Sequence, residues 1–252
     1  MNIGVIGLGV VGKANADGFK KLNHTVLIHD IKLNTNIQDV LDTDVVFVCT
    51  QEDNVEQVVK DLFLYNYKGI VAIRSTIQPG TIDNLLERFT LPICYVPEFL
   101  KERSALEDFL DCDLLAIGSY NTIHARKIAE VYKNIPKHVE YLTPREAEIL
   151  KIYNNSYAAL RVVFANIIYE VCEKHDADYN IIKTAYEKTG KTTGNYLDVN
   201  EDLRGFGGMC LPKDTGKLSK ELKKLNLHYD LINAIIDDNK KFKTTIFDGM
   251  RK

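Results

Sequence analysis

The first twelve residues constrain the fold of this chain more than any other stretch of it. A short apolar run, Asn2–Ile6, leads directly into Gly7-Leu8-Gly9-Val10-Val11-Gly12, and the ten residues that follow have helical spacing. A G-x-G-x-x-G sequence between a strand and a helix predicts dinucleotide binding. Gly7 would allow the tight turn, Gly9 would let the backbone approach a pyrophosphate, and Gly12 would allow close packing of helix on strand.

The next strand completes this nucleotide-binding pattern. The free N–H groups and partial positive charge of a helix N-terminus suit the phosphates of a dinucleotide. The strand Thr25–His29 ends at Asp30, 18 residues after Gly12. An acid there accepts hydrogen bonds from ribose hydroxyls and repels a 2′-phosphate, so the pattern predicts NAD rather than NADP. The backbone of the cradle would comprise Gly7, Leu8, Gly9, Val10, Val11 and Gly12.

Apolar strands alternate with helical segments through the first 142 residues. Strands that are apolar throughout indicate a parallel sheet covered by helices on both faces. We therefore expect an α/β protein whose residues 1–142 form a doubly wound Rossmann domain. The expected strands are Val45–Thr50, Ile70–Ser75, Leu91–Val96 and Leu114–Ile117, and the expected helices are Ile37–Leu41 (a helix or turn), Val55–Leu62 and Gly80–Phe89.

Several polar residues stand where the predicted strands end. Thr50 closes one strand, Ser75 and Thr76 follow the next, and Pro97-Glu98 follows a third. Ligands of doubly wound sheets bind outside the carboxyl ends of the strands. Thr50, Ser75 and Thr76 are therefore candidate cofactor contacts by position.

The pattern changes after residue 142. Thr143-Pro144-Arg145-Glu146 is a capping box with proline at the first helical position, and no glycine or proline interrupts the chain from there to about His175. Apolar residues occupy much of this helix's circumference, which predicts a dimerisation spine or a helix wrapped by its own chain. We expect residues 143–252 to form an all-helical domain with this one long central helix. Its other helices would be Tyr179–Lys188, Thr215–Leu225 and Leu231–Met250, with a polar segment, Lys191–Arg204, between the first two.

Composition narrows the classes of function. The net charge of −3 with both signs interspersed gives no indication of nucleic acid as a partner. Five widely spaced cysteines without a C-x-x-C pair argue against a disulfide framework and against a zinc or other metal site. We expect no signal peptide and no membrane span, and therefore a cytoplasmic location.

One glycine-rich loop carries the strongest chemical signal. Gly205–Asp214 contains three glycines ahead of Cys210, with Lys213 and Asp214 three and four residues after the thiol. A thiol beside a lysine and a carboxylate has the components of an activated nucleophile. The alternative interpretation is a surface loop with a buried, inert cysteine.

Two further pairs have helical spacing. Lys151 and Asn155 lie four residues apart in the long helix, so they share one face. Glu98 and Glu102 have the same spacing after a strand's carboxyl end. Taken alone, the first pair fits a solvated face and the second an acidic helix N-terminus.

Together these stretches resemble one family, the nucleotide-sugar dehydrogenases of the UDP-glucose 6-dehydrogenase and GDP-mannose dehydrogenase types. The resemblance extends along the whole chain, and the stretches occur in the family's order. A rival class, the β-hydroxyacid dehydrogenases, shares a Lys-x-x-Asn-Asn helix but needs no thiol. The matching stretches are Gly7–Gly12, Arg74–Thr81, Pro97–Glu102 with Ala105–Phe109, Glu148–Asn155 and Gly205–Asp214.

The resemblance implies a role for each matched residue. Cys210 would capture the aldehyde as a thiohemiacetal, and Lys151 and Asn155 would stabilise oxyanions. Asp214 would order a water beside Lys151, and Thr76 would contact that water or the sugar hydroxyl. Glu102 would be the base that hydrolyses the thioester. Residues near the sugar would be Glu98, Phe206, Gly207 and Lys213.

The implied reaction oxidises a sugar's primary alcohol to an acid with two hydride transfers to NAD. The rival class makes one transfer. Members of the family commonly have a third domain that helps to bind the nucleotide, and we expect this chain to lack it. The missing part would then come from a separate chain or a dimer partner, unless the substrate is smaller or the protein is a reduced NAD-binding module.

Overall fold

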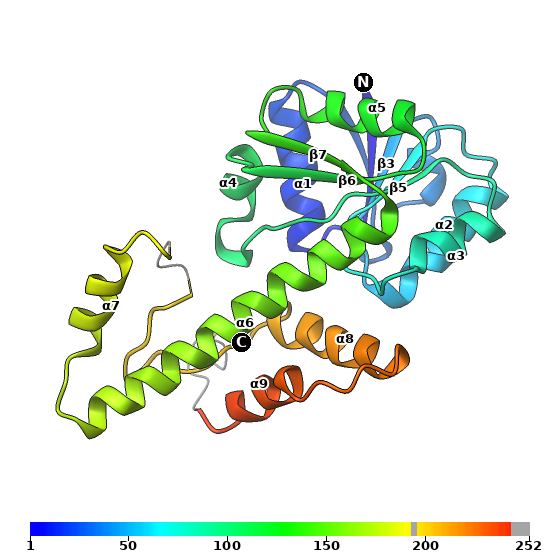
Figure 1. Cartoon of the computed structure of the whole chain (residues 1–252). Helices are drawn as coiled ribbons and strands as arrows, with labels where there is room; N and C mark the ends of the chain where they lie inside the picture. Colours follow the sequence, from blue (N-terminus) through cyan, green and yellow to red (C-terminus); the bar gives the residue numbers. More distant parts are fainter. Residues whose placement is uncertain (193–195, 243–252) are drawn as a thin grey trace. The chain divides into compact units, whose positions relative to one another are not determined.

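The computed structural model describes residues 1–192 and 196–242, and the chain divides into two compact units (Figure 1). The first unit is Met1–Lys151, and the second begins at Ile152. The predicted boundary at residue 142 lies nine residues earlier. It differs because the first two turns of the long helix pack into the first unit, where Ala147 is fully buried among strand residues.

A seven-stranded sheet forms the centre of the first unit, in the order β2-β1-β3-β4-β5-β6-β7. All neighbouring strands are parallel except β5 and β6, which are antiparallel, so the expectation of a wholly parallel sheet is wrong at this pair. The strands are β1 (Asn2–Ile6), β2 (Thr25–His29), β3 (Val45–Val48), β4 (Ile70–Ile73), β5 (Ile93–Tyr95), β6 (Leu114–Gly118) and β7 (His138–Leu142).

Helices cover both faces of this sheet, as the uninterrupted apolar strands predict. Neighbouring residues of one strand point to opposite faces, so Val46 and Val48 pack with α2 and α3 while Val45 and Phe47 pack with α1, α4 and α5. The helices are α1 (Val10–Lys21), α2 (Glu52–Leu64), α3 (Thr81–Arg88), α4 (Ala105–Leu110) and α5 (Thr122–Tyr132), with short 3-10 turns η1 (Ile31–Leu33), η2 (Ile37–Val40) and η3 (Glu102–Ser104).

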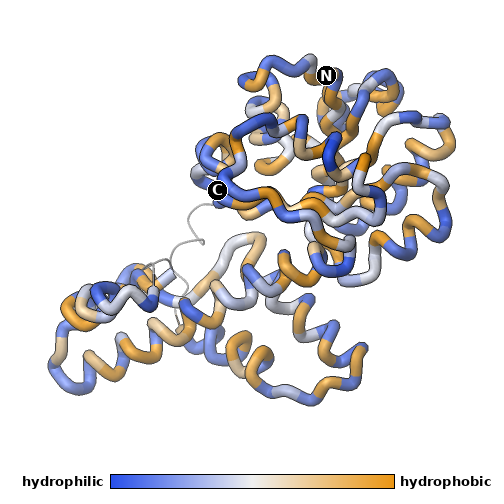
Figure 2. The backbone as a smooth tube through the Cα atoms, turned by 45° about the horizontal axis from the view of Figure 1, so that its top comes forward, coloured by the Kyte–Doolittle hydropathy of each residue, from blue (hydrophilic) through white to orange (hydrophobic). Residues whose placement is uncertain are grey.

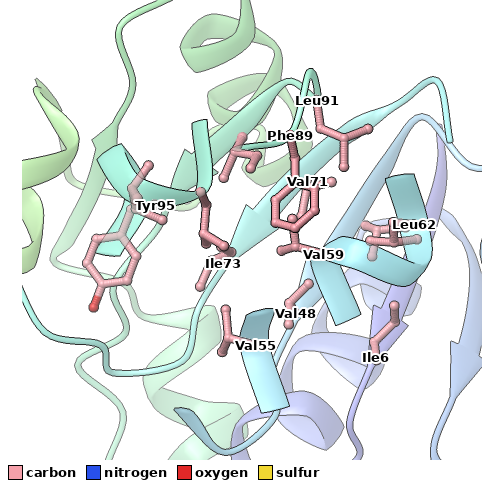
Figure 3. Packing of buried hydrophobic residues seen from close by; sticks show 14 of the residues in the cluster. Ile6, Val48, Val55, Val59, Leu62, Val71, Ile73, Phe89, Leu91 and Tyr95 are labelled. Atoms are coloured by element: carbon pink, nitrogen blue, oxygen red, sulfur yellow. The ribbon is translucent and has the colours of Figure 1, made fainter. Parts of the chain in front are cut away.

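Figure 3 shows the packing of buried residues in the core on the side of α2 and α3. Val55, Val59 and Leu62 of α2 stand one helical turn apart and are all buried against the strands. Colouring by hydropathy shows the helices changing between apolar and polar along their length (Figure 2). This is the pattern of helices with one buried face.

Two α-helices and one strand were absent from the sequence-based expectation: α4, α5 and β7. The last is a strand at the edge of the sheet, and four of its five residues are exposed. Its sequence, His-Val-Glu-Tyr-Leu, has no apolar run because neither face is covered. An edge strand of this kind cannot be recognised from burial patterning.

The second unit is helical, as predicted, and shares with the first the long helix α6 (Pro144–Lys174). Its other helices are α7 (Tyr179–Glu187), α8 (Leu211–Lys224) and α9 (Leu231–Asn239). The helix expected over Leu231–Met250 ends at Asn239, and residues 243–250 lie outside the described residues. Part of the expected polar segment, residues 193–195, also lies outside them.

Two small cores hold the second unit together. One joins α6 to α9 through Ala159, Val163, Phe206 and Ile235. The other joins α6 to α7 and contains Ala165, Cys172, Tyr179 and Val199.

Candidate active site

The glycine turn after β1 has the geometry that a dinucleotide requires. Gly7 has φ +87°, which favours glycine, and a Cβ on Gly12 would lie 1.7 Å from the Gly7 carbonyl oxygen. A Cβ on Gly9 would meet nothing within 4 Å, so this side of the turn is open. Helix α1 begins at Val10 without a side-chain cap, so its first N–H groups point to the open side. These residues fit a pyrophosphate.

Asp30 lies beside this turn at the end of β2. Its Oδ2 accepts the Leu8 N–H at 2.6 Å and its Oδ1 accepts the Lys32 N–H at 2.8 Å. These hydrogen bonds, that from Leu8 first, lower the pKa of the Asp30 carboxyl, so it is ionised at neutral pH. A carboxylate has about four acceptor positions, which leaves capacity for ribose hydroxyls. Asp30 therefore also fixes the glycine turn, which its position in the sequence did not indicate.

The ends of β3 and β4 bring the other predicted cofactor residues together. The Ser75 hydroxyl donates to the Thr50 carbonyl at 2.6 Å, and Ser75 and Thr76 are both buried. The buried Thr50 Oγ1 has no hydrogen-bond partner among the described residues, so a polar group of a ligand would satisfy it.

Arg74 was not predicted as part of the site, although it lies within a matched stretch. Its guanidinium is buried and donates to the Tyr132 hydroxyl at 2.8 Å and to the Val96 carbonyl at 3.3 Å. The guanidinium thus joins β4 to the segment after β5 and to α5. Its positive charge also acts on Glu98.

Glu98 and Lys151 form a buried ion pair inside the first unit. Lys151 Nζ lies 3.0 Å from Glu98 Oε1 and donates to the Glu98 carbonyl at 2.6 Å, and the side chains are 3% and 6% exposed for Lys151 and Glu98. Burial opposes ionisation of Glu98, but the charge of Lys151, with smaller help from Arg74 and the Leu100 N–H, holds its pKa below the usual value. Glu98 is therefore ionised at neutral pH.

Glu102 is not part of this pair. It begins η3 and is exposed, whereas Glu98 is buried, although the two are four residues apart. Residues 96–101, between β5 and η3, form no helix, so the shared-face argument does not apply here.

In the second unit, Cys210 is the N-cap of α8 and is exposed. Asp214 lies one turn further, is fully buried, and accepts a hydrogen bond from Asn155 Nδ2 at 2.5 Å. The Asp214 N–H donates to the Cys210 carbonyl at 2.9 Å, so the thiol and the carboxylate are parts of the same helical turn. The interpretation of Cys210 as a buried thiol is wrong.

The glycine-rich loop before Cys210 is fixed from both sides. The Phe206 N–H donates to Asn239 Oδ1 at 2.7 Å, and Asn239 Nδ2 donates back to the Phe206 carbonyl at 2.8 Å. Asn166 Oδ1 accepts the Gly205 N–H at 3.1 Å. The Phe206 ring is buried in the core that joins α6 to α9, so Phe206 contributes only its backbone to the surface of the loop.

Lys213 and Gly207 complete the predicted set. The Lys213 side chain is about half exposed, and its Nζ lies 3.7 Å from Asp214 Oδ1. Gly207 is half-buried. Sequence reasoning missed Asn166 and Asn239. For Asn166 the signal is an asparagine among apolar residues of α6, whereas Asn239 follows Asp237 and Asp238 at the end of α9 and gives no such signal.

No group of three or more His, Cys, Asp or Glu side chains within residues 1–192 and 196–242 has an arrangement that holds a metal ion. Over the same part of the chain, no helix is both long and apolar enough to cross a membrane.

Comparison with known proteins accounts for both units. The family model for the central domain of the UDP-glucose/GDP-mannose dehydrogenase family matches residues 145–241, and the model for its NAD binding domain matches residues 34–136. UDP-glucose 6-dehydrogenase from Campylobacter jejuni is 31% identical over 98% of this chain and 74% of that protein. The chain belongs to the UDP-glucose/GDP-mannose dehydrogenase family. The resemblance inferred from the five stretches is thus confirmed, and so is NAD as the cofactor of this dehydrogenase.

Other family members match over a smaller part of their length. UDP-glucose 6-dehydrogenase from Rickettsia typhi is 28% identical over 75% of this chain but only 44% of that protein. The structure of a UDP-glucose dehydrogenase from Pyrobaculum islandicum has the same fold, with a TM-score of 0.87 and 24% identity over 95% of this chain and 68% of that one. The NAD-domain match begins at residue 34, so the glycine turn and Asp30 precede it.

Proposed function

We propose that this protein is a nucleotide-sugar 6-dehydrogenase of the UDP-glucose type, which oxidises a primary alcohol of the sugar to a carboxylic acid. The observation that carries the proposal is the first turn of α8, where the exposed Cys210 precedes a buried Asp214 that is hydrogen-bonded to Asn155. NAD supplies a hydride acceptor for each of the two oxidation steps.

Cys210 is the proposed nucleophile. Its sulfur adds to the carbonyl carbon of the aldehyde formed by the first oxidation, and the resulting thiohemiacetal holds the intermediate on the protein. Loss of a second hydride from that carbon gives a thioester. Water then adds to the thioester carbon, and the C–S bond breaks to release the acid and the thiolate of Cys210.

Lys151 and Asn155 are the proposed stabilisers of negative charge on the substrate oxygen. They lie four residues apart on α6, so both side chains project from the same side of the helix. Positively charged or amide donors held in place before the reaction lower the barrier to oxyanion formation. The hydrogen bonds to Glu98 and Asp214 support this role because they restrict both side chains.

Hydrolysis of the thioester requires a base and an ordered water. We assign the base to Glu102, whose exposed carboxylate is accessible to solvent, and the ordering of the water to Asp214 and Thr76. The sugar would be contacted by Glu98, Lys213 and the backbone of Phe206 and Gly207. The location of the reaction would be the cytoplasm.

A homodimer through α6 is part of the proposal. A row of large apolar side chains on the second-unit part of this helix is exposed, which is costly for a monomer. A second copy of the chain, or a separate chain that supplies a nucleotide-binding domain, would cover it. The exposed residues are Tyr153, Tyr157, Phe164, Ile167 and Val171.

The test is the stoichiometry of cofactor reduction. The protein is mixed with NAD and, separately, with UDP-glucose, GDP-mannose or an N-acetylated UDP-sugar, and the absorbance of reduced NAD is followed. We expect two reduced cofactors per sugar oxidised. One per sugar would support the β-hydroxyacid type of reaction, with which the Lys151–Asn155 helix is also compatible. NAD binding without reduction, even with an added nucleotide-binding domain, would contradict the enzyme proposal.

A further inference from the structure

Glu148 is a buried carboxylate that the proposed chemistry does not use. It lies in the second turn of α6, three residues before Lys151, and its side chain is inaccessible to solvent. Its Oε2 accepts the Gly80 N–H at 2.6 Å, and its Oε1 accepts the Ile82 N–H at 2.9 Å. All four residues belong to the first unit.

These hydrogen bonds replace the missing cap of α3. The first N–H groups of a helix lack intrahelical partners and are usually satisfied by a side chain at the N-cap. The N-cap of α3 is Gly80, with φ +91° and no side chain to accept them. Glu148, 68 residues later in the sequence, supplies the acceptor, and a negative charge at this end of a helix is favourable.

The capped helix follows the segment that carries Thr76. This segment, residues 74–80, continues from β4 at one end and is held by Glu148 at the other. One turn further along α6, Lys151 is held to Glu98, in the segment after β5. The same two turns of α6 are therefore attached to the segments that follow two neighbouring strands.

We propose that Glu148 is a positioning residue that fixes Thr76 relative to Lys151, an inference that rests on the proposed function. Without the two hydrogen bonds, Ser75, Gln78 and Arg74 would still hold the start and middle of the segment 74–80 to Thr50, α2 and α5. Its end at Gly80 would lose its buried bonds to α6, and the distance of that end from α6 would vary. Misplacement of a group in an active site by about 1 Å can reduce the rate roughly 10²-fold. Glu148 itself touches neither substrate nor cofactor in this proposal.

The strength of the two hydrogen bonds to Gly80 and Ile82 depends on the ionisation of Glu148. Burial raises the pKa of Glu148 to about 7, against the opposing effect of the two backbone N–H groups. The charged groups that face it are Asp83 on α3, which raises the pKa further, and Arg145 on α6, which lowers it. The Tyr120 hydroxyl donates to Asp83 at 2.8 Å on the same side. A protonated carboxyl accepts hydrogen bonds less well, so both bonds are strongest above about pH 7.

The experiment compares Glu148→Gln and Glu148→Asp with a control on the same helix, Glu146→Gln. Glutamine has the same shape, but its amide group faces one of the two N–H donors. Aspartate keeps the charge and is shorter by one methylene. Glu146 is exposed and only caps α6 through Thr143, so its loss affects helix stability alone.

With UDP-glucose and NAD, we expect kcat to fall about 10- to 100-fold in Glu148→Gln, with KM and NAD affinity nearly unchanged. Glu148→Asp should retain more activity. In the wild-type protein, kcat should rise as the pH rises through about 7, because Glu148 then becomes ionised. This rise should be absent in Glu148→Gln. Glu146→Gln should keep the wild-type kcat and pH profile. A folded Glu148→Gln protein with both unchanged would overturn the inference.

A second measurement does not depend on turnover. In wild-type protein, the backbone amide shifts of Gly80 and Ile82 should titrate near pH 7, together with shifts at Thr76 and Lys151. A titration confined to Gly80 and Ile82 would make Glu148 a helix cap only and would overturn the positioning role. If the wild-type protein oxidises no nucleotide sugar, the proposed function fails, and this titration still decides whether Glu148 connects the two segments.

Discussion

Asn155 donates a hydrogen bond from Nδ2 to Oδ2 of Asp214 over 2.5 Å, and both side chains are buried. The bond joins the long helix α6 to the first turn of α8, whose N-cap is Cys210. Asn155 also accepts the Asn154 side-chain amide at 2.9 Å. A buried amide on α6 therefore helps to hold the turn that carries the cysteine.

Replacing Asn155 by leucine should destabilise the protein by about 1–3 kcal/mol, because Asp214 loses a buried donor. Urea unfolding would measure the loss, and activity should fall as well. The matched variant Asn154→Leu, on the exposed side of the same turn, should cost much less. Equal losses for the two variants would contradict the importance of the Asn155–Asp214 bond.

Replacing Cys210 by alanine should abolish the second oxidation, with a loss of overall turnover on the order of 10³-fold or more. NAD affinity, measured by calorimetry, should stay at the wild-type value because the glycine turn belongs to the first unit. Cys172→Ala, which removes a buried thiol from the core of the second unit, is the control and should keep its activity. Full turnover by Cys210→Ala would exclude a covalent intermediate.

Replacing Lys151 by methionine should destabilise the protein by about 3–5 kcal/mol at neutral pH, because the buried Glu98 loses its main partner. The pKa of Glu98 is below its usual value in the folded protein, so its contribution is present at neutral pH and is lost as the pH falls through the folded pKa.

In Lys151→Met, burial should instead raise the pKa of Glu98. The stability deficit relative to wild type should then be largest at about pH 7 and smaller at about pH 5. Denaturant unfolding at the two pH values measures this difference. A deficit that is independent of pH would mean that Glu98 is not charged in the folded protein. The double variant Lys151→Met, Glu98→Leu should recover part of the lost stability.

Replacing Asp30 by asparagine should weaken NAD binding by roughly 1–3 kcal/mol and reduce the preference for NAD over NADP. The carboxylate both accepts the Leu8 N–H and presents negative charge to the ribose. Calorimetric titration with each cofactor would measure the effect. Asp42→Asn, an exposed residue nearby in the sequence, should leave both affinities unchanged.

The sequence alone determined those features that depend on local pattern. The turn of Gly7, Gly9 and Gly12 specified the first strand, turn and helix, because few backbones other than this one need glycine at those three positions. The capping box at Thr143 located the start of α6. The lack of glycine and proline in the residues that follow indicated that this helix is long. The string around Cys210 identified the family because it is long and specific.

Only the tertiary structure decided which side chains meet. Glu98 and Glu102 lie four residues apart, which would place them on one face of a helix. In the structure Glu98 is paired with Lys151, whereas Glu102 is exposed. Glu148 caps a helix 68 residues away, and the edge strand β7 forms without an apolar run. Hydrogen bonds and ion pairs between distant segments depend on how packed elements approach one another in space, which spacing along the chain does not encode.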